Sequence, residues 1–228
     1  MSAEQEVELR LDRGARGVRS LITRAVGIDE QALVRVRELG GGVLDVFVTT
    51  PFQVVAARRA QGVAPADGWV TAAAPLGQCL QTALDHADPQ LDDAATVTAE
   101  QQGRGPEAQW PGALPPAEGF QLIDELPAHL VRQLSERGRS LARQFSGPLG
   151  PPASLMDQTV ARVTSQGQDA EITMRMIFAC TALGLIPADG RSGVPQHLRV
   201  SARGRWVRLD APFGTVYYVP GGLNVFAL

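Results

Sequence analysis

The chain has 228 residues, of which 44% are hydrophobic and 20% charged, and its formal net charge is −3. This is typical of a globular protein with one large domain or two small ones, each able to bury a core. All 21 basic residues are Arg and none is Lys, which excludes P-loop NTPases, pyridoxal enzymes, protein kinases and Ser-x-x-Lys acyl enzymes, because each needs a Lys.

Targeting signals are missing from the printed sequence. The first residues are acidic and no apolar run approaches 18 residues, so the sequence predicts neither a signal peptide nor a membrane helix. Cys79 and Cys180 lie far apart, which fits reduced thiols better than a disulfide framework. We therefore expect a cytoplasmic protein.

The chain begins with short β and α signals. Residues 7–11 alternate apolar and polar side chains, which predicts a strand, and residues 18–26 predict a short helix. Residues 33–37 and 43–49 predict a hairpin, because the glycines 40–42 between them can supply the positive φ of its turn.

An apolar helix is the next expectation. Thr50 is a good N-cap and Pro51 is tolerated at the first helical position, so we expect a helix that ends at Gly62. A strand at 69–72 and a helix at 76–84 follow.

Residues 85–119 differ in composition from their surroundings. This segment has seven acidic residues, five prolines and few large apolar side chains, which is typical of a linker or a long surface loop. The predicted domains are therefore 1–84, an N-terminal α+β lobe, and 120–228, a C-terminal α+β lobe, with 85–119 as the acidic linker between them.

The second half contains the strongest helical pattern. An amphipathic helix is predicted to follow residues 120–123, with these apolar side chains repeating at helical spacing and Val131 and Ala142 beside them: Leu126, Leu130, Leu134, Leu141 and Phe145. A hairpin at 159–164 and 170–173 leads into a core helix that ends at Gly184. Three alternating segments then predict an antiparallel meander, at 198–202, 205–209 and 215–219.

Two apolar stretches resemble each other. Each stops at a glycine, Gly62 or Gly184, and each continues to a Pro-Ala-Asp-Gly turn, at 65–68 and 187–190. This favours an internal repeat, with 36–68 matching 159–190, although different elements follow the two copies. We expect an α+β fold of two related lobes, each an antiparallel sheet with a packed apolar helix.

Catalytic and metal-binding motifs are missing from the sequence. His86, His129 and His197 are widely separated, and the spacings typical of zinc ligands do not occur. The acidic pairs Asp92-Asp93 and Asp124-Glu125 are only weak metal candidates. We expect no cofactor and a protein that binds rather than catalyses.

The candidate binding residues form an arginine-bearing surface in the C-terminal lobe. An Arg cluster with an interleaved Trp can bind phosphates or an acidic partner. The predicted meander contributes Arg199, Arg203, Arg205, Trp206 and Arg208, and the strong helix contributes Arg132, Arg139 and Arg143 on one side.

A family resemblance is carried by residues 150–160, Gly-Pro-Pro-Ala-Ser-Leu-Met-Asp-Gln-Thr-Val, together with Trp-Val-Arg-Leu-Asp at 206–210. Both segments resemble uncharacterised conserved proteins of high-GC actinobacteria, mainly over the second half of the chain. The resemblance implies no activity and no site.

Three functions remain open. The first is a non-catalytic regulatory or binding protein whose arginine-bearing surface meets a protein partner. Nucleic-acid binding through the same arginines is the second, and it predicts a steep dependence on salt. An enzyme of a type without a recognised motif is the third; it would show a deep pocket with converging titratable groups.

Overall fold

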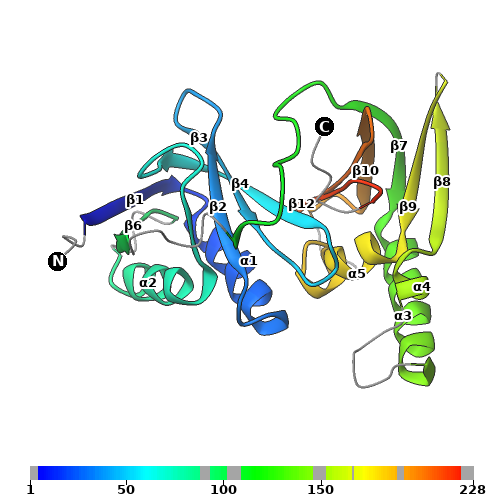
Figure 1. Cartoon of the computed structure of the whole chain (residues 1–228), viewed down its shortest axis with the longest axis horizontal. Coiled ribbons are helices and arrows are strands. Elements are labelled where there is room, and N and C mark those ends of the chain that lie inside the picture. The colour runs from blue at the N-terminus through cyan, green and yellow to red at the C-terminus, as the bar shows by residue number, and fades with distance from the viewer. Residues whose placement is uncertain are drawn as a thin grey trace. The chain divides into compact units, whose positions relative to one another are not determined.

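The computed structural model describes residues 5–87, 93–101, 109–145, 153–165, 167–188 and 193–221. The chain divides into two compact units: unit 1 is Met1–Pro51 with Ala56–Pro111, and unit 2 is Phe52–Val55 with Gly112–Leu228. Both units combine antiparallel strands with helices (Figure 1), so the predicted α+β class is confirmed.

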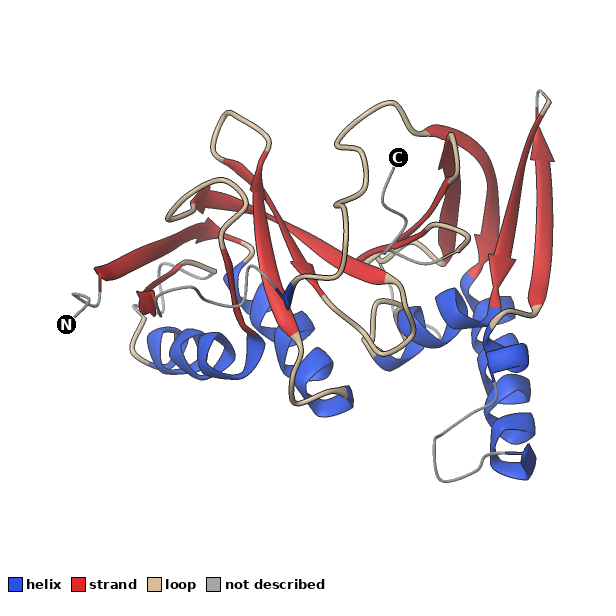
Figure 2. Ribbon diagram, viewed as in Figure 1, coloured by secondary structure: helices blue, strands red, loops and turns tan. Residues whose placement is uncertain are grey.

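Unit 1 is built on a six-stranded antiparallel arrangement. Its elements are β1 (Gln5–Arg13), α1 (Ala15–Ile28), β2 (Leu33–Glu38), β3 (Val43–Val48), β4 (Val55–Val63), β5 (Val70–Ala72), α2 (Ala73–Asp85) and β6 (Ala95–Gln101). The strand order is β5-β2-β3-β4-β1-β6. The helices α1 and α2 pack against each other beside these strands (Figure 2), and they bury Ile22 and Leu80 completely.

Unit 2 has a four-stranded sheet and a separate hairpin. Its elements are β7 (Gln121–Pro127), α3 (Ala128–Phe145), α4 (Ala153–Met156), β8 (Thr159–Ser165), β9 (Gln168–Thr173), α5 (Met174–Ala182), β10 (His197–Arg203), β11 (Trp206–Ala211) and β12 (Gly214–Tyr218). The sheet order is β7-β10-β11-β12, and β8 pairs with β9. The apolar helix α5 is buried, as expected of a core helix, and packs against α3.

Each unit contains two strand-helix-strand segments. The first strand of each segment pairs with the last strand of the other segment. In unit 1, β2 of the first segment pairs with β5 of the second, and β6 of the second pairs with β1 of the first. In unit 2, β10 pairs with β7 and β8 pairs with β9 in the same way. All four pairs are antiparallel and the two helices of each unit are in contact, so each unit has approximate two-fold internal symmetry.

One segment of each unit is longer than the other. The segment β1-α1-β2 continues into β3 and β4, and β9-α5-β10 continues into β11 and β12. We call these the long halves, and we call β5-α2-β6 and β7-α3-β8 the short halves. Unit 1 has its long half first along the chain and unit 2 has it last. The two units therefore contain a long half and a short half in opposite order along the chain.

The helix predicted to end at Gly62 is wrong. Residues 51–54 form a turn in which Gln53 takes a φ of 57°, and β4 follows, paired with β3 and β1. The β-branched Val54 and Val55 and two open strand edges outweigh the helix preference of the Ala-rich sequence. The proposed match of 36–68 with 159–190 fails with it, because only the second copy is a helix; Asp189 and Gly190 lie outside the described residues.

The linker prediction for 85–119 is wrong where the structure describes the segment. Strand β6 pairs with β1 over seven residues, and Trp110 is buried. Asp93, a weak metal candidate in the sequence, caps α1, because its carboxylate accepts the backbone N–H groups of Gly14 at 2.9 Å and Arg16 at 2.7 Å. Residues 88–92 and 102–108 are outside the described part.

The predicted buried face of α3 is right for Val131 and Ala142, which are buried, but wrong for most of its large side chains. Leu126 belongs to β7, Leu130 and Leu141 are exposed, and the Phe145 side chain is not among those described. The buried side instead carries small residues, among them Ser135 and Gly138. A Cβ at Gly138 would stand 2.6 Å from the sulfur of Met174 on α5, so close helix contact selects the small face over the leucine face.

Glycine-to-alanine changes test these assignments. Gly184 has a φ of 63° after α5, so Gly184→Ala should lower the free energy of unfolding by about 1 kcal/mol. Gly62→Ala should cost about 2 kcal/mol or more, because its Cβ would overlap the carbonyl oxygen of Arg10 on the paired strand β1. Denaturant unfolding measures both changes.

The matched control is Gly27→Ala in α1. A Cβ there meets nothing within 4 Å, so this change should stabilise the protein by about 0.5 to 1 kcal/mol through helix propensity. A Gly62→Ala variant as stable as the parent chain would contradict the close approach of β1 and β4.

Candidate functional site

The predicted meander arginines lie on one sheet of unit 2. Arg199 and Arg203 are exposed on β10, Arg205 is exposed in the turn that follows, and Trp206 and Arg208 are half-buried on β11. The pairing register places Arg203 opposite Trp206. Four of these five residues thus occur on two neighbouring strands, with Arg205 in the turn between them.

Several of these arginines are engaged within their own unit. Arg203 donates to the carbonyl of Glu118, and Arg205 donates to the carbonyl of Pro220 at 2.6 Å. Arg208 pairs with Asp210 at 2.9 Å, and its guanidinium lies 4.6 Å from the centre of the Phe120 ring. Part of their hydrogen-bonding capacity is used inside the protein, and their role in binding stays a prediction.

The predicted arginines of the strong helix lie on α3. Arg132 donates to the carbonyl of Pro187 at 2.7 Å, and Arg139 approaches the Thr181 hydroxyl at 3.4 Å. Arg143 is exposed in the last turn, where a cation is favoured by the helix dipole. These side chains lie on the side of α3 next to its contact with α5.

Basic charge is concentrated on two of the helices. Together α1 and α3 contain seven of the 21 arginines but one of the 24 acidic residues, so these helices carry a net charge of +6 in a chain of −3. Sequence reasoning missed Arg16, Arg19 and Arg24 on α1. Counting charges helix by helix would have found them, because α1 contains no acid.

The burial pattern turns this charge outward. On α1 the apolar side chains, such as Leu21 and Ile22, face the core, whereas Arg16 and Arg24 are exposed. On α3 the exposed arginines include Arg137 and Arg143. Exposed helix surfaces on which positive charge predominates create a field that attracts polyanions. This is the clearest functional feature of the described residues.

Arg175 forms a separate polar cluster inside unit 2. It is 6% exposed at the start of α5 and donates to the carbonyl of Phe52 at 2.9 Å and to the side-chain oxygen of Gln53 at 2.8 Å. It also pairs with Asp157, and its guanidinium lies 5.5 Å from the centre of the Tyr218 ring. Burial raises the pKa of Tyr218, and the neighbouring Arg175 opposes that rise.

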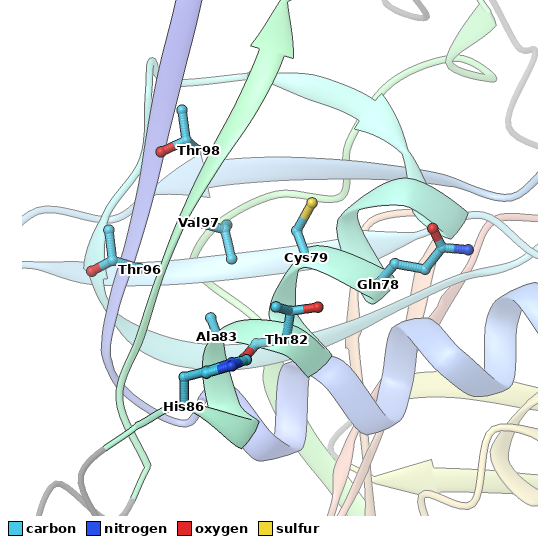
Figure 3. Close-up of a pocket in the computed structure, with 8 residues that line it drawn as sticks. All are labelled: Gln78, Cys79, Thr82, Ala83, His86, Thr96, Val97 and Thr98. Atoms are coloured by element: carbon cyan, nitrogen blue, oxygen red, sulfur yellow. The ribbon is translucent and has the colours of Figure 1, made fainter.

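A groove lies between α2 and β6 in unit 1, with a volume of about 600 Å³. Its lining is mostly uncharged: Gln78, Cys79, Thr82, Ala83 and His86 on α2, and Thr96, Val97 and Thr98 on β6. Figure 3 shows Cys79 on α2 and Val97 on β6 among the side chains that line it. The groove is wide open to solvent and has no cluster of acids and bases, so it suits binding better than catalysis.

Metal-binding clusters and membrane-spanning helices are both absent from the described residues. Among the residues that the structure describes, no three His, Cys, Asp or Glu side chains gather into a group that could hold a metal. In the same part of the chain, no helix has the length and apolar character needed to cross a membrane.

Comparison with protein families finds two matches, one in each half of the chain. Residues 2–103 match a domain of unknown function (DUF8010), and residues 115–223 match another domain of unknown function (DUF8185). No curated protein matches the sequence.

Solved structures share the fold at low sequence identity. A protein from Eubacterium rectale assigned as a DNA polymerase III beta subunit is 10% identical with a TM-score of 0.55, over 93% of this chain and 64% of that one. The Bartonella birtlesii sliding clamp bound to griselimycin is 10% identical with a TM-score of 0.54, over 98% and 67%. The Caulobacter crescentus DNA polymerase sliding clamp is 10% identical with a TM-score of 0.54, over 97% and 66%.

These likenesses show that the chain has the fold of the sliding clamps, with repeated α+β lobes. The chain spans about two thirds of the length of the clamps that it matches.

The contribution of Arg175 to the free energy of unfolding can be compared with that of an exposed arginine. Arg175→Met should lower the free energy of unfolding by about 2 to 3 kcal/mol, because it leaves the Phe52 carbonyl and the Gln53 amide without their donor. Arg162→Met removes an exposed pair with Glu171 and should lower stability much less, because solvent screens exposed ion pairs. Equal losses in urea unfolding would show that the buried Arg175 cluster adds no more to stability than the exposed pair does.

The two thiols should react differently with iodoacetamide. Cys79 is exposed, whereas Cys180 is buried and burial raises its pKa from 9.0 to about 12. At pH 8 the folded protein should be alkylated at Cys79 alone, and at both thiols in urea, as mass spectrometry will show. Because the folded pKa of Cys180 is the higher one, its contribution to stability is complete below about pH 9 and is lost as the pH rises toward 12.

Cys79→Ser is the control for this experiment. The folded variant should resist alkylation at pH 8. Labelling of Cys180 at the rate seen in urea would mean that α5 is not held in the core.

Proposed function

We propose that this chain is a non-catalytic binding protein of the sliding-clamp fold, in which the arginine-bearing helix α1 of unit 1 and the arginine-bearing helix α3 of unit 2 each contact a nucleic-acid backbone. The single observation that carries the proposal is the net charge of +6 on these two helices in a chain of net −3. Arginine suits this role, because its planar guanidinium donates two parallel hydrogen bonds to a phosphate.

The exposed positions on the helices support backbone contact rather than base reading. Arg24, Arg137 and Arg143 are exposed and are distributed along two helices instead of being gathered at one helix end. Contacts of this kind neutralise phosphates without regard to sequence, and they release counterions. The proposed binding is therefore non-specific in sequence and strongly dependent on salt.

The fold adds support from a different direction. Three of the solved structures that share it are sliding clamps or an assigned subunit of DNA polymerase III. At 10% identity this likeness concerns the fold alone, and DNA binding by this chain rests on its own charges.

A protein partner on the meander is the second candidate, and one observation favours it. Leu122 on β7 is 48% exposed and pairs opposite Ser201 on β10, near Arg203 and Trp206. An exposed apolar side chain beside arginine and tryptophan is the composition of a protein interface. This surface would take an acidic segment with an apolar side chain.

Two triple variants with equal charge separate these proposals. The first changes Arg24, Arg137 and Arg143 to Gln, and the second changes Arg199, Arg203 and Arg205 to Gln. For a fluorescent 30-base-pair DNA, the helix variant should reduce the slope of log K against log salt by roughly 2 to 3, because up to three phosphate contacts are lost. The meander variant should leave the slope within about 1 of the parent value.

Fluorescence anisotropy at NaCl concentrations from about 25 to about 200 mM measures both slopes. A larger effect of the meander variant would move nucleic-acid binding to the predicted arginine stretch. If the parent chain does not bind DNA at the lowest salt, the proposed function is wrong.

A further inference from the structure

The approximate symmetry of unit 1 gives β2 and β6 equivalent places. Superimposing one strand-helix-strand segment on the other places β1 on β5, α1 on α2 and β2 on β6. The pair β2-β5 then falls on the pair β6-β1. In the long half, the other edge of β2 pairs with β3. In the short half, β6 pairs with β1, and no strand of the described residues covers its other edge.

The open edge of β6 is suited to receiving a strand. An edge strand offers a row of unpaired backbone N–H and C=O groups, and proteins usually protect such an edge with charged residues, proline or a covering segment. Residues Ala95 to Thr98 have β-branched or small side chains, with neither a charge nor a proline, and the one charged residue of β6, Glu100, is near the end of the strand. Thr96 and Thr98 are exposed, so this part of the strand is accessible.

The groove beside this edge defines the side chains that would fit. It is lined by the uncharged residues of α2 and β6 described above, with His86 as the one imidazole, and its volume of about 600 Å³ has room for several small side chains. Cys79 and Ala83 on α2 provide apolar surface beside the buried Val97 on β6 (Figure 3). Charged side chains would find no counter-charge among these residues.

The equivalent strand of unit 2 is better protected. Side chains of β8 are tied to β9: Thr159 donates to Glu171 at 3.0 Å, Thr164 donates to Asp169 at 2.7 Å, and Arg162 pairs with Glu171. The charged groups on this hairpin oppose pairing with another chain. Each of the two equivalent strands has one charged residue, but Arg162 is at the middle of β8, whereas Glu100 is next to the last position of β6.

We propose that β6 accepts an extended, uncharged peptide segment of a partner protein as an added antiparallel strand. The backbone of the segment would pair with β6 as β3 pairs with β2, and alternate small or β-branched side chains would enter the groove against α2. This site is independent of the arginine helices, and peptide binding can succeed or fail whatever the result with DNA.

A phage library of random 12-residue peptides supplies the probe. The full chain is the bait, and the Thr82→Arg variant removes peptides that bind elsewhere, because Thr82 is exposed on α2 and lines the groove. Selected peptides should lack charge and proline at alternating positions. Synthetic copies should bind Thr82→Arg at least tenfold more weakly than the parent chain.

Thr23→Arg is the matched control, since Thr23 is exposed on α1 outside the groove. It makes the same chemical change and should alter peptide affinity by less than twofold. Bound peptide should also slow hydrogen exchange at amides of β6 and alkylation of Cys79 in the groove.

Three results would overturn the proposal. Selected peptides could bind Thr82→Arg and the parent chain equally, or they could bind without protecting β6. Sedimentation could also show that the parent chain self-associates and that Thr82→Arg abolishes this while Thr23→Arg does not, which would assign the edge to a second copy.

Discussion

Pairing between the two strand-helix-strand segments of each unit is the constraint on which the architecture depends. A strand-helix-strand segment has a strand before and a strand after its helix, and these two strands do not pair with each other. The two segments of a unit supply the hydrogen-bonding partners for each other's strands. The helices must then lie in contact, which explains why α3 presents small residues to α5 and leaves larger ones outside. Exposed helix surface is therefore a necessary product of this arrangement, and in α1 and α3 it is arginine-rich.

Local signals allowed much of the fold to be predicted. Alternating and helical patterns identified β1, α1, the hairpin of β2 and β3, the helix α2 and the meander. The failures were at β4, β6 and the C-terminal part of β7, whose identity depends on partners distant in sequence. Val55 to Gly62 lies in an Ala-rich stretch with helix preference, and Asp85 to Gly119 has a composition that suggests a loop, but pairing with β1 fixes both strands.

The candidate site was only partly accessible from sequence. Arg132, Arg139 and Arg143 were found because the α3 pattern is strong, whereas the arginines of α1 were passed over with a weakly predicted helix. Arg175 was read as one charge in a core helix, and only the structure reveals the Phe52 carbonyl and the Asp157 carboxylate beside it. A sequence shows how many charges a helix has, but tertiary contacts decide which of them are used internally.

The opposite order of the two halves has a consequence for synthesis on the ribosome. A chain emerges from its N-terminus, and its domains tend to fold as they are completed. Unit 1 presents its long half first, so β3 and β4 are available before the short half arrives. Unit 2 presents β7, α3 and β8 first, and their pairing strands β10 and β9 emerge afterwards. The leucines and open strand edges of this segment stay exposed during that interval, when a chaperone would have most to protect.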